Sequence, residues 1–203
     1  MSKPKPGTRN ENGPERYGVV AIALHWLIAL MIVYMLWLGY STAHAMGESD
    51  PRRLDLVQLH KSIGLTILIL SIARLIWRFF HPPPALPAHM PGWEIAAARA
   101  SHTLFYVLIL AVPLFGLATA SASPLGLPTY LFGLFEFPHL PFLADLPRVE
   151  KAVVVVPIHT AHATLAYSLL ALLALHVGAA LKHHFWDHDA VLIRILPMRR
   201  KIR

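Results

Sequence analysis

Long apolar stretches alternate with short polar ones along this chain, and three of the apolar stretches contain no Lys, Arg, Asp or Glu. These three are residues 17–47, 100–135 and 152–181. Each is longer than the roughly 20 residues that a helix needs to cross the hydrocarbon core of a bilayer. A fourth stretch, residues 54–80, carries charges towards both ends but has an uncharged aliphatic centre. None of the four alternates with the period of two that membrane strands show. The pattern therefore predicts an all-α membrane protein, a bundle of four spanning helices.

The four helices are expected to form one membrane domain, residues 17–190, between an N-terminal tail (1–16) and a basic amphipathic tail (191–203). Because the second tail mixes aliphatic residues with arginines, we expect it to lie at the membrane surface. The loop before the fourth helix, about residues 121–151, is unusually apolar. An apolar loop of that length is typical of a segment that lies in the membrane interface or covers a site. The predicted helices are residues 17–40, 54–80, 100–121 and 157–182.

Basic residues predict the orientation, because short loops on the cytoplasmic side of a membrane carry an excess of Lys and Arg. The two tails, the loop after the second helix and the helix ends beside them hold 13 of the 18 basic residues. The other side holds only Arg52, Arg53, Lys61, Arg148 and Lys151. We therefore expect both termini in the cytoplasm. The net charge of +7 then reflects this topology and contact with anionic lipid, and it is no sign of nucleic-acid binding.

Composition narrows the chemistry that such a bundle can perform. Of the 203 residues, 56% are hydrophobic and 14% are charged, whereas soluble domains average about 45–50% and about 25%. The chain has no cysteine, which excludes disulfides, zinc–thiolate sites, iron–sulfur clusters and thiol nucleophiles. It has 13 histidines, more than its 11 acidic residues. Histidine is therefore the residue type on which a functional site would depend.

Four histidines fall at matched depths in the predicted helices. His162 and His176 are fourteen residues apart in the fourth helix, which is close to four turns, or about 21 Å along one face. The first helix runs outward, and His25 lies near its inner end, at the level of His176. The second helix begins outside, and His60 lies in its outer turns, at the level of His162. The sequence therefore predicts an inner pair, His25 with His176, and an outer pair, His60 with His162.

The same fourteen-residue step recurs in the other helices. It places Arg74 of the second helix at the inner level, where His102 of the third helix also lies. It places Gly39 and Gly116 at the outer level. Glycine leaves clearance for a flat ligand that lies against a helix. The outer level thus combines two histidines with two glycines, and the inner level adds an arginine and a third histidine to its pair.

Two opposed imidazoles in an apolar bundle fit haem iron with two axial histidines. Arg74 and His102 could then neutralise haem propionates, which would offset the cost of a cation inside the membrane. With both axial positions filled, oxygen finds no open position on iron, and outer-sphere electron transfer is expected. Zinc or copper transport without haem stays open as a further possibility, although it normally recruits carboxylate, Met or Cys ligands as well.

Short motifs surround these histidines in all four predicted helices. They are Arg16-Tyr17-Gly18 and Leu24-His25-Trp26-Leu27, then His60-Lys61-Ser62-Ile63-Gly64 with Arg74-Leu75 and Arg78, then Ser101-His102 with Pro113 and Gly116, and finally His162, His176, His183-His184-Phe185-Trp186 and Leu196-Pro197. Together they resemble the bacterial cytochrome b561 family over nearly the whole chain from residue 16.

The resemblance implies a multi-pass protein of the bacterial cytoplasmic (inner) membrane with two haem b groups. It implies His25, His60, His162 and His176 as the axial ligands of the haem irons. The family moves electrons between the quinone pool and another donor or acceptor, and at least one member oxidises superoxide at the outer face and reduces ubiquinone.

We therefore expect a dihaem cytochrome of the respiratory chain, with the lipid bilayer, a quinone and a redox partner protein as its partners. An alternative is a cytochrome b subunit that anchors a peripheral dehydrogenase or hydrogenase. Whether the chain is an enzyme by itself stays open, and the sequence assigns no catalytic residue.

Overall fold

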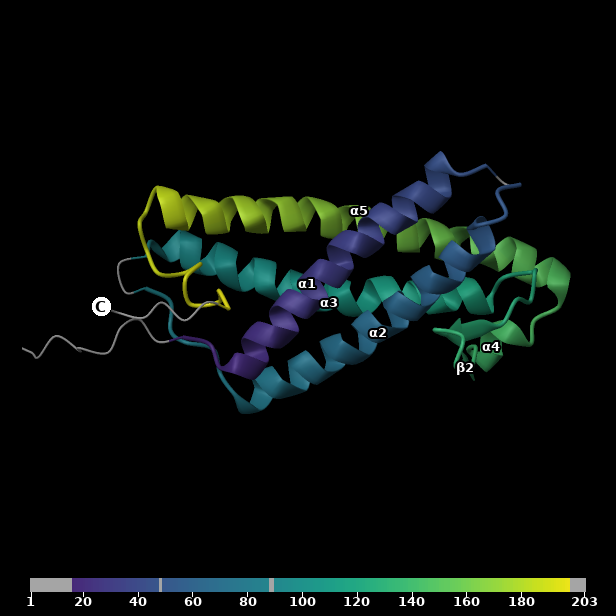
Figure 1. The fold of residues 1–203 in the computed structure, drawn as a ribbon, viewed down its shortest axis with the longest axis horizontal. Coiled ribbons are helices and arrows are strands. Elements are labelled where there is room, and N and C mark those ends of the chain that lie inside the picture. The colour runs from purple at the N-terminus through teal and green to yellow at the C-terminus, as the bar shows by residue number, and fades with distance from the viewer. Residues whose placement is uncertain (1–15, 48, 88–89, 198–203) are drawn as a thin grey trace, which may run out of the picture.

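The computed structural model describes residues 16–47, 49–87 and 90–197. The predicted N-terminal tail, apart from its last residue, and the last six residues of the predicted C-terminal tail lie outside the described residues. Within them, four helices are long and apolar enough to cross a membrane, as Figure 1 shows. These are α1 (Val19–Tyr40), α2 (Arg53–Phe80), α3 (Gly92–Ser121) and α5 (Arg148–Phe185). The prediction of an all-α bundle with four spanning helices is confirmed.

The helices pack around one apolar core. α3 lies along α5, α2 packs against α3, and α1 packs against α2, so that α1 and α2 cross the α3–α5 pair obliquely (Figure 1). The core cluster draws on all four helices and consists of Ile28, Ile32, Ile67, Leu108, Ile109, Leu169 and Leu172. Large apolar side chains also cover the outside of the bundle, among them Leu30, Trp37, Leu114 and Leu175. An apolar exterior of this extent is what contact with lipid requires.

Four of the core side chains lie midway between the two histidine levels. Ile32, Ile67, Ile109 and Leu169 come one from each helix and belong to the same buried cluster. Each stands seven residues, or about two turns, from both positions of the fourteen-residue step in its helix. We call these four residues the aliphatic layer. It separates the outer level from the inner level.

Two helices are longer than predicted. α3 begins at Gly92, whereas residue 100 was expected, and α5 runs from Arg148 to Phe185, whereas residues 157–182 were expected. The predicted bounds followed the uncharged stretches, which mark the hydrocarbon core of the membrane. Backbone hydrogen bonding continues beyond that core, where charged residues such as Arg99 and Arg148 are exposed. Both helices instead begin directly after a proline.

The apolar loop before α5 is folded and docks on the start of α2. It contains a hairpin of β1 (Thr129–Leu131) and β2 (Phe135–Phe137), followed by the short helix α4 (Pro141–Ala144). The hydroxyl of Ser62 in α2 accepts a hydrogen bond from the Phe132 N–H (3.0 Å) and lies 2.8 Å from the Tyr130 carbonyl oxygen. The hairpin is thus held two residues beyond His60, over the outer end of the bundle (Figure 1).

Replacing Ser62 by alanine is expected to loosen this hairpin. The Phe132 N–H would lose its acceptor, and an unsatisfied buried donor costs about 1–3 kcal/mol. We expect lower thermal stability and faster hydrogen exchange at the hairpin amides. Ser168→Ala is the matched control, because the exposed Ser168 hydroxyl bonds only to its own helix, at the Thr164 carbonyl oxygen. Equal exchange rates in the two variants would contradict the anchoring role.

The described ends of the chain lie together at the opposite end of the bundle (Figure 1). Residues 191–195 form a turn, and this segment folds back onto the start of α1. The Trp26 indole donates to the Ile195 carbonyl oxygen over 2.8 Å, and the Tyr17 N–H donates to the Arg194 carbonyl oxygen over 3.3 Å. The described part of the predicted C-terminal tail therefore lies against the helices.

Candidate functional site

The outer pair joins α2 to α5 inside the bundle. The ring centroids of His60 and His162 are 6.2 Å apart, and the ring planes meet at 76°. The Nδ1 atom of His162 lies 2.9 Å from the Val112 carbonyl oxygen of α3. A carbonyl oxygen only accepts hydrogen bonds, so Nδ1 carries the ring proton, and Nε2 keeps the lone pair that a metal ion needs.

Glycines make room for both outer rings. A Cβ atom built on Gly39 of α1 would lie 3.2 Å from Cε1 of His60. A Cβ atom built on Gly116 of α3 would lie 3.2 Å from Cε1 and 3.4 Å from Nδ1 of His162. These separations are tighter than ordinary contact between carbon atoms. Glycine is therefore needed at each position because a ring occupies the space of its missing side chain.

The inner level gathers side chains from all four helices. His25 of α1 and His176 of α5 have centroids 6.4 Å apart, and His102 of α3 lies 5.9 Å from His176. The Nη2 atom of Arg74 in α2 lies 3.0 Å from Nδ1 of His25. Since an arginine only donates, Nδ1 of His25 is the acceptor in this arrangement.

The spacing of both pairs suits a metal ion between two imidazoles. An imidazole nitrogen lies about 2 Å from its metal ion, and the ring centre lies about 1.1 Å beyond the nitrogen, so two rings on opposite sides have centroids about 6.2 Å apart. The measured separations of 6.2 Å and 6.4 Å agree with that value. The donor set is also suitable, because neutral imidazole is an axial ligand of haem iron. The residues present therefore fit haem at both levels.

The structure brings together every site residue that the sequence analysis grouped. His60 faces His162 with the two glycines beside them, and His25 faces His176 with Arg74 and His102 around them.

The sequence analysis missed two features of the site. The Val112 carbonyl orients His162, and no side-chain pattern reveals a backbone acceptor. Tyr106 lies under two guanidinium groups, with its ring centroid 5.9 Å from Arg74 and 5.5 Å from Arg78. Its position one turn after His102 is a signal that would have found it.

Two lysines act on His139 at the end of the bundle that the hairpin covers. His139, which follows β2, lies with Nε2 2.9 Å from the Thr129 hydroxyl. Burial, together with the charges of Lys61 and Lys151, lowers the pKa of His139, against the opposing effect of Glu136. The two lysines come from different helices, α2 and α5.

Known proteins are similar to this chain over almost its whole length. The model of the family described as prokaryotic cytochrome b561 matches residues 16–198. Cytochrome b561 homolog 2 of Escherichia coli (strain K12) is 36% identical over 186 residues, which are 91% of this chain and 93% of that protein. Cytochrome b561 homolog 1 of the same organism is 28% identical over 185 residues, or 91% of this chain and 99% of that protein. A probable superoxide oxidase, CybB, of Yersinia pestis is 29% identical over 189 residues, or 92% of this chain and 98% of that protein.

Proposed function

The chain belongs to the prokaryotic cytochrome b561 family, and from this premise we propose how it carries electrons. Members of the family bind haem b, so the chain is a multi-pass membrane cytochrome b with an electron-transfer function. We propose that it holds two haem b groups, one at each histidine level. The observation that carries this proposal is the pair of imidazole separations, 6.2 Å and 6.4 Å, at two depths of one bundle.

His60 and His162 would hold the outer haem, and His25 and His176 the inner one. When bound, haem b would supply a one-electron iron couple, and a pair of histidines at each level would leave oxygen no place to bind. The protein orients these ligands: the Val112 carbonyl fixes the ring of His162, and Gly39 admits the ring of His60. Electrons would cross the membrane between the two levels.

We place both termini in the cytoplasm, the helices in the bacterial inner membrane, and a quinone such as ubiquinone at one surface as the partner in electron exchange. The excess of basic residues on the side of the termini supports this orientation. The apolar exterior of the bundle is in contact with the phase in which quinones dissolve.

Turnover with quinone and a small reductant would make the protein an oxidoreductase, whereas a need for a co-purifying protein would favour an anchor subunit.

A second candidate is oxidation of superoxide at the outer face. The Yersinia pestis relative carries the name of a probable superoxide oxidase. In this chain, Lys61 and Lys151 both act on His139, and we propose that these two lysines would attract the anion at this end of the bundle, where the five basic and six acidic residues otherwise nearly balance.

The first experiment is to purify the protein from haem-replete cells and to measure haem per chain from reduced-minus-oxidised spectra. Two low-spin b haems are expected. One haem per chain would remove one histidine pair from the proposal, and a folded protein without haem would favour a metal transporter. Reduction of the bound haem by quinol or by superoxide, each added alone, then identifies the electron donor.

Arg74 is expected to raise the midpoint potential of the inner haem. A histidine that binds metal through Nε2 carries its proton on Nδ1, so His25 would then be unable to accept from Arg74. We expect the guanidinium to turn to the haem propionates, which are acceptors that it favours. A unit charge within about 10 Å is worth on the order of 1.5 kcal/mol, or about 70 mV, at an effective dielectric constant of about 20.

Arg74→Ala should therefore lower the midpoint potential of the inner haem by several tens of millivolts without loss of haem. Arg74→Lys keeps the charge and should restore most of the potential. An unchanged redox titration in Arg74→Ala would remove this role.

A further inference from the structure

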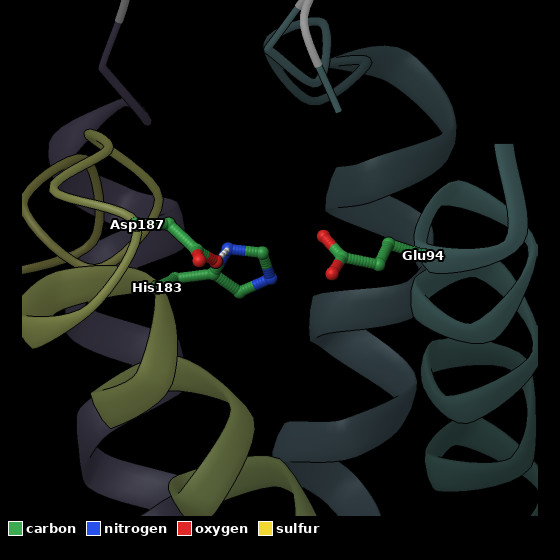
Figure 2. Close-up of side chains that lie close together, drawn as sticks. All are labelled: Glu94, His183 and Asp187. Carbon is green, nitrogen blue, oxygen red and sulfur yellow. Dashed lines mark ion pairs between the residues drawn. The ribbon is translucent and has the colours of Figure 1, made fainter. Parts of the chain in front are cut away.

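A hydrogen-bonded cluster of charged side chains closes the gap between the first turn of α3 and the end of α5. Lys182 Nζ lies 2.7 Å from Glu94 Oε1 and 2.8 Å from Asp187 Oδ2. His183 Nδ1 lies 3.0 Å from Asp187 Oδ2 and 2.7 Å from Asp189 Oδ2. Figure 2 shows Glu94 on one side of the gap, with His183 and Asp187 on the other. We call these five residues the α3–α5 cluster.

The cluster borders a hollow and has a surplus of negative charge. The hollow has a volume of about 340 Å³ and is lined by Met90, Pro91, Glu94, Lys182, Asp187 and Asp189. Three carboxylates face one ammonium group and one histidine. The side chains of Glu94 and Asp189 are 11% and 3% exposed. Three of the 11 acidic residues of the chain thus gather at the end of the bundle where its basic residues also collect.

The position of the cluster connects it to the inner level. His183 follows His176 by seven residues in α5, which is two turns, or about 10 Å, along nearly the same face. Glu94 precedes His102 by eight residues in α3. Both helices therefore carry a cluster residue about two turns from an inner histidine. Because α3 and α5 pack along each other, the cluster and the inner level lie on one seam of the bundle.

We propose that the α3–α5 cluster is the proton-entry site for quinone reduction at the inner level. This inference rests on the proposed function. Conversion of a quinone to a quinol takes two electrons, which the cytochrome delivers, and two protons, which form the two O–H bonds. Water in the hollow would give each proton to a carboxylate oxygen of Glu94 or Asp187, and the hydrogen-bonded His183 would relay it towards the seam.

The residue types in the cluster favour proton entry over two other roles, a structural clamp between the helices and a site for a metal ion. A clamp between α3 and α5 needs only the Glu94 carboxylate for the Lys182 ammonium group, so it leaves Asp187 without a purpose. Asp189, by contrast, also accepts a hydrogen bond from the Val191 N–H over 2.9 Å. A resident metal ion could use Glu94, His183 and Asp187, whose ligand atoms lie within 4.8 Å of one another. That position is already taken by the ammonium group of Lys182, which bonds to both Glu94 and Asp187.

The test compares an acceptor that takes up protons with one that does not. The haem-loaded protein, reduced chemically in liposomes, would be oxidised either by a short-chain ubiquinone or by ferricyanide, which accepts one electron and no proton. Glu94→Gln and Asp187→Asn should slow oxidation by quinone at least fivefold at pH 8, less at pH 6, and leave oxidation by ferricyanide unchanged. His184→Gln is the matched control, because the neighbouring His184 ring packs on Phe185 outside the cluster.

Zinc provides a second probe, since a zinc ion that displaces Lys182 would block the carboxylates. Added Zn²⁺ should inhibit oxidation by quinone in the wild type and in His184→Gln, but not in Glu94→Gln. Unchanged quinone rates in both cluster variants from pH 6 to pH 8 would overturn the proposal. Equal slowing with both acceptors would also overturn it, because it would reveal only a structural clamp. Failure of the wild type to reduce quinone at all would instead contradict the quinone partner itself.

Discussion

A variant in which His60 or His162 is replaced by alanine is expected to hold one haem, in place of the two that we propose for the wild type. The two imidazoles of a pair would hold one haem between them, so loss of either ring should remove the same haem. His25→Ala and His176→Ala should each remove the other haem. Haem per chain and the two midpoint potentials, read from reduced-minus-oxidised spectra during a redox titration, measure the effect.

Double variants test directly which histidines share a haem. His60→Ala combined with His162→Ala should still leave one haem, whereas His60→Ala combined with His176→Ala should leave none. Loss of the same haem from His25→Ala and His60→Ala would show that the pairing is wrong.

His102 provides the internal control, because its ring is as near to His176 as the ring of His25 is. His102→Ala is expected to keep both haems. If it loses the inner haem while His25→Ala retains it, His102 is the axial ligand.

Replacing Gly116 by leucine is expected to remove the outer haem without touching a ligand. Even a Cβ atom at this position would lie 3.2 Å from the ring of His162. A leucine would therefore push the imidazole away and break its hydrogen bond to the Val112 carbonyl. The expected result is one haem per chain, a single remaining midpoint potential and a lower temperature of thermal unfolding.

The matched control for this substitution is Gly178→Leu in α5. Nothing lies within 4 Å of a Cβ atom built on Gly178, so this variant should keep both haems. Gly116→Ala should have an intermediate effect, because a small shift of the ring relieves the contact. Full haem content in Gly116→Leu would contradict the close packing of glycine against the ligand.

The pairing of the histidines could be predicted from residue numbers alone because spanning helices are long and regular. A fixed rise and rotation per residue convert a spacing of fourteen into a common depth and face, and this placed Arg74 at the inner level together with His102. The helix ends could not be predicted in the same way. The charged residues near Glu94 and Arg148 mark where the membrane ends, but the backbone remains helical beyond it.

Features that depend on backbone groups or on distant partners also escaped prediction. The hairpin forms where the Ser62 hydroxyl meets the N–H of Phe132, and nothing in the sequence around residue 132 identifies that contact. The contact of Arg74 with His25 was unexpected for a related reason. A long side chain such as that of arginine can reach several hydrogen-bond acceptors, and the one to which it bonds depends on which acceptors the folded protein brings within its reach.

The aliphatic layer of Ile32, Ile67, Ile109 and Leu169 has a consequence for energy conversion. Aliphatic side chains hold no proton, whereas an electron tunnels through them. Transfer between the two levels would therefore move negative charge across the membrane without a compensating proton, and each electron would work with or against the membrane voltage. That work is about 2.3 kcal/mol per charge for every 100 mV. The direction of flow would then depend on voltage as well as on the midpoint potentials of the two proposed haems, and a change in membrane energisation would shift the redox balance between them.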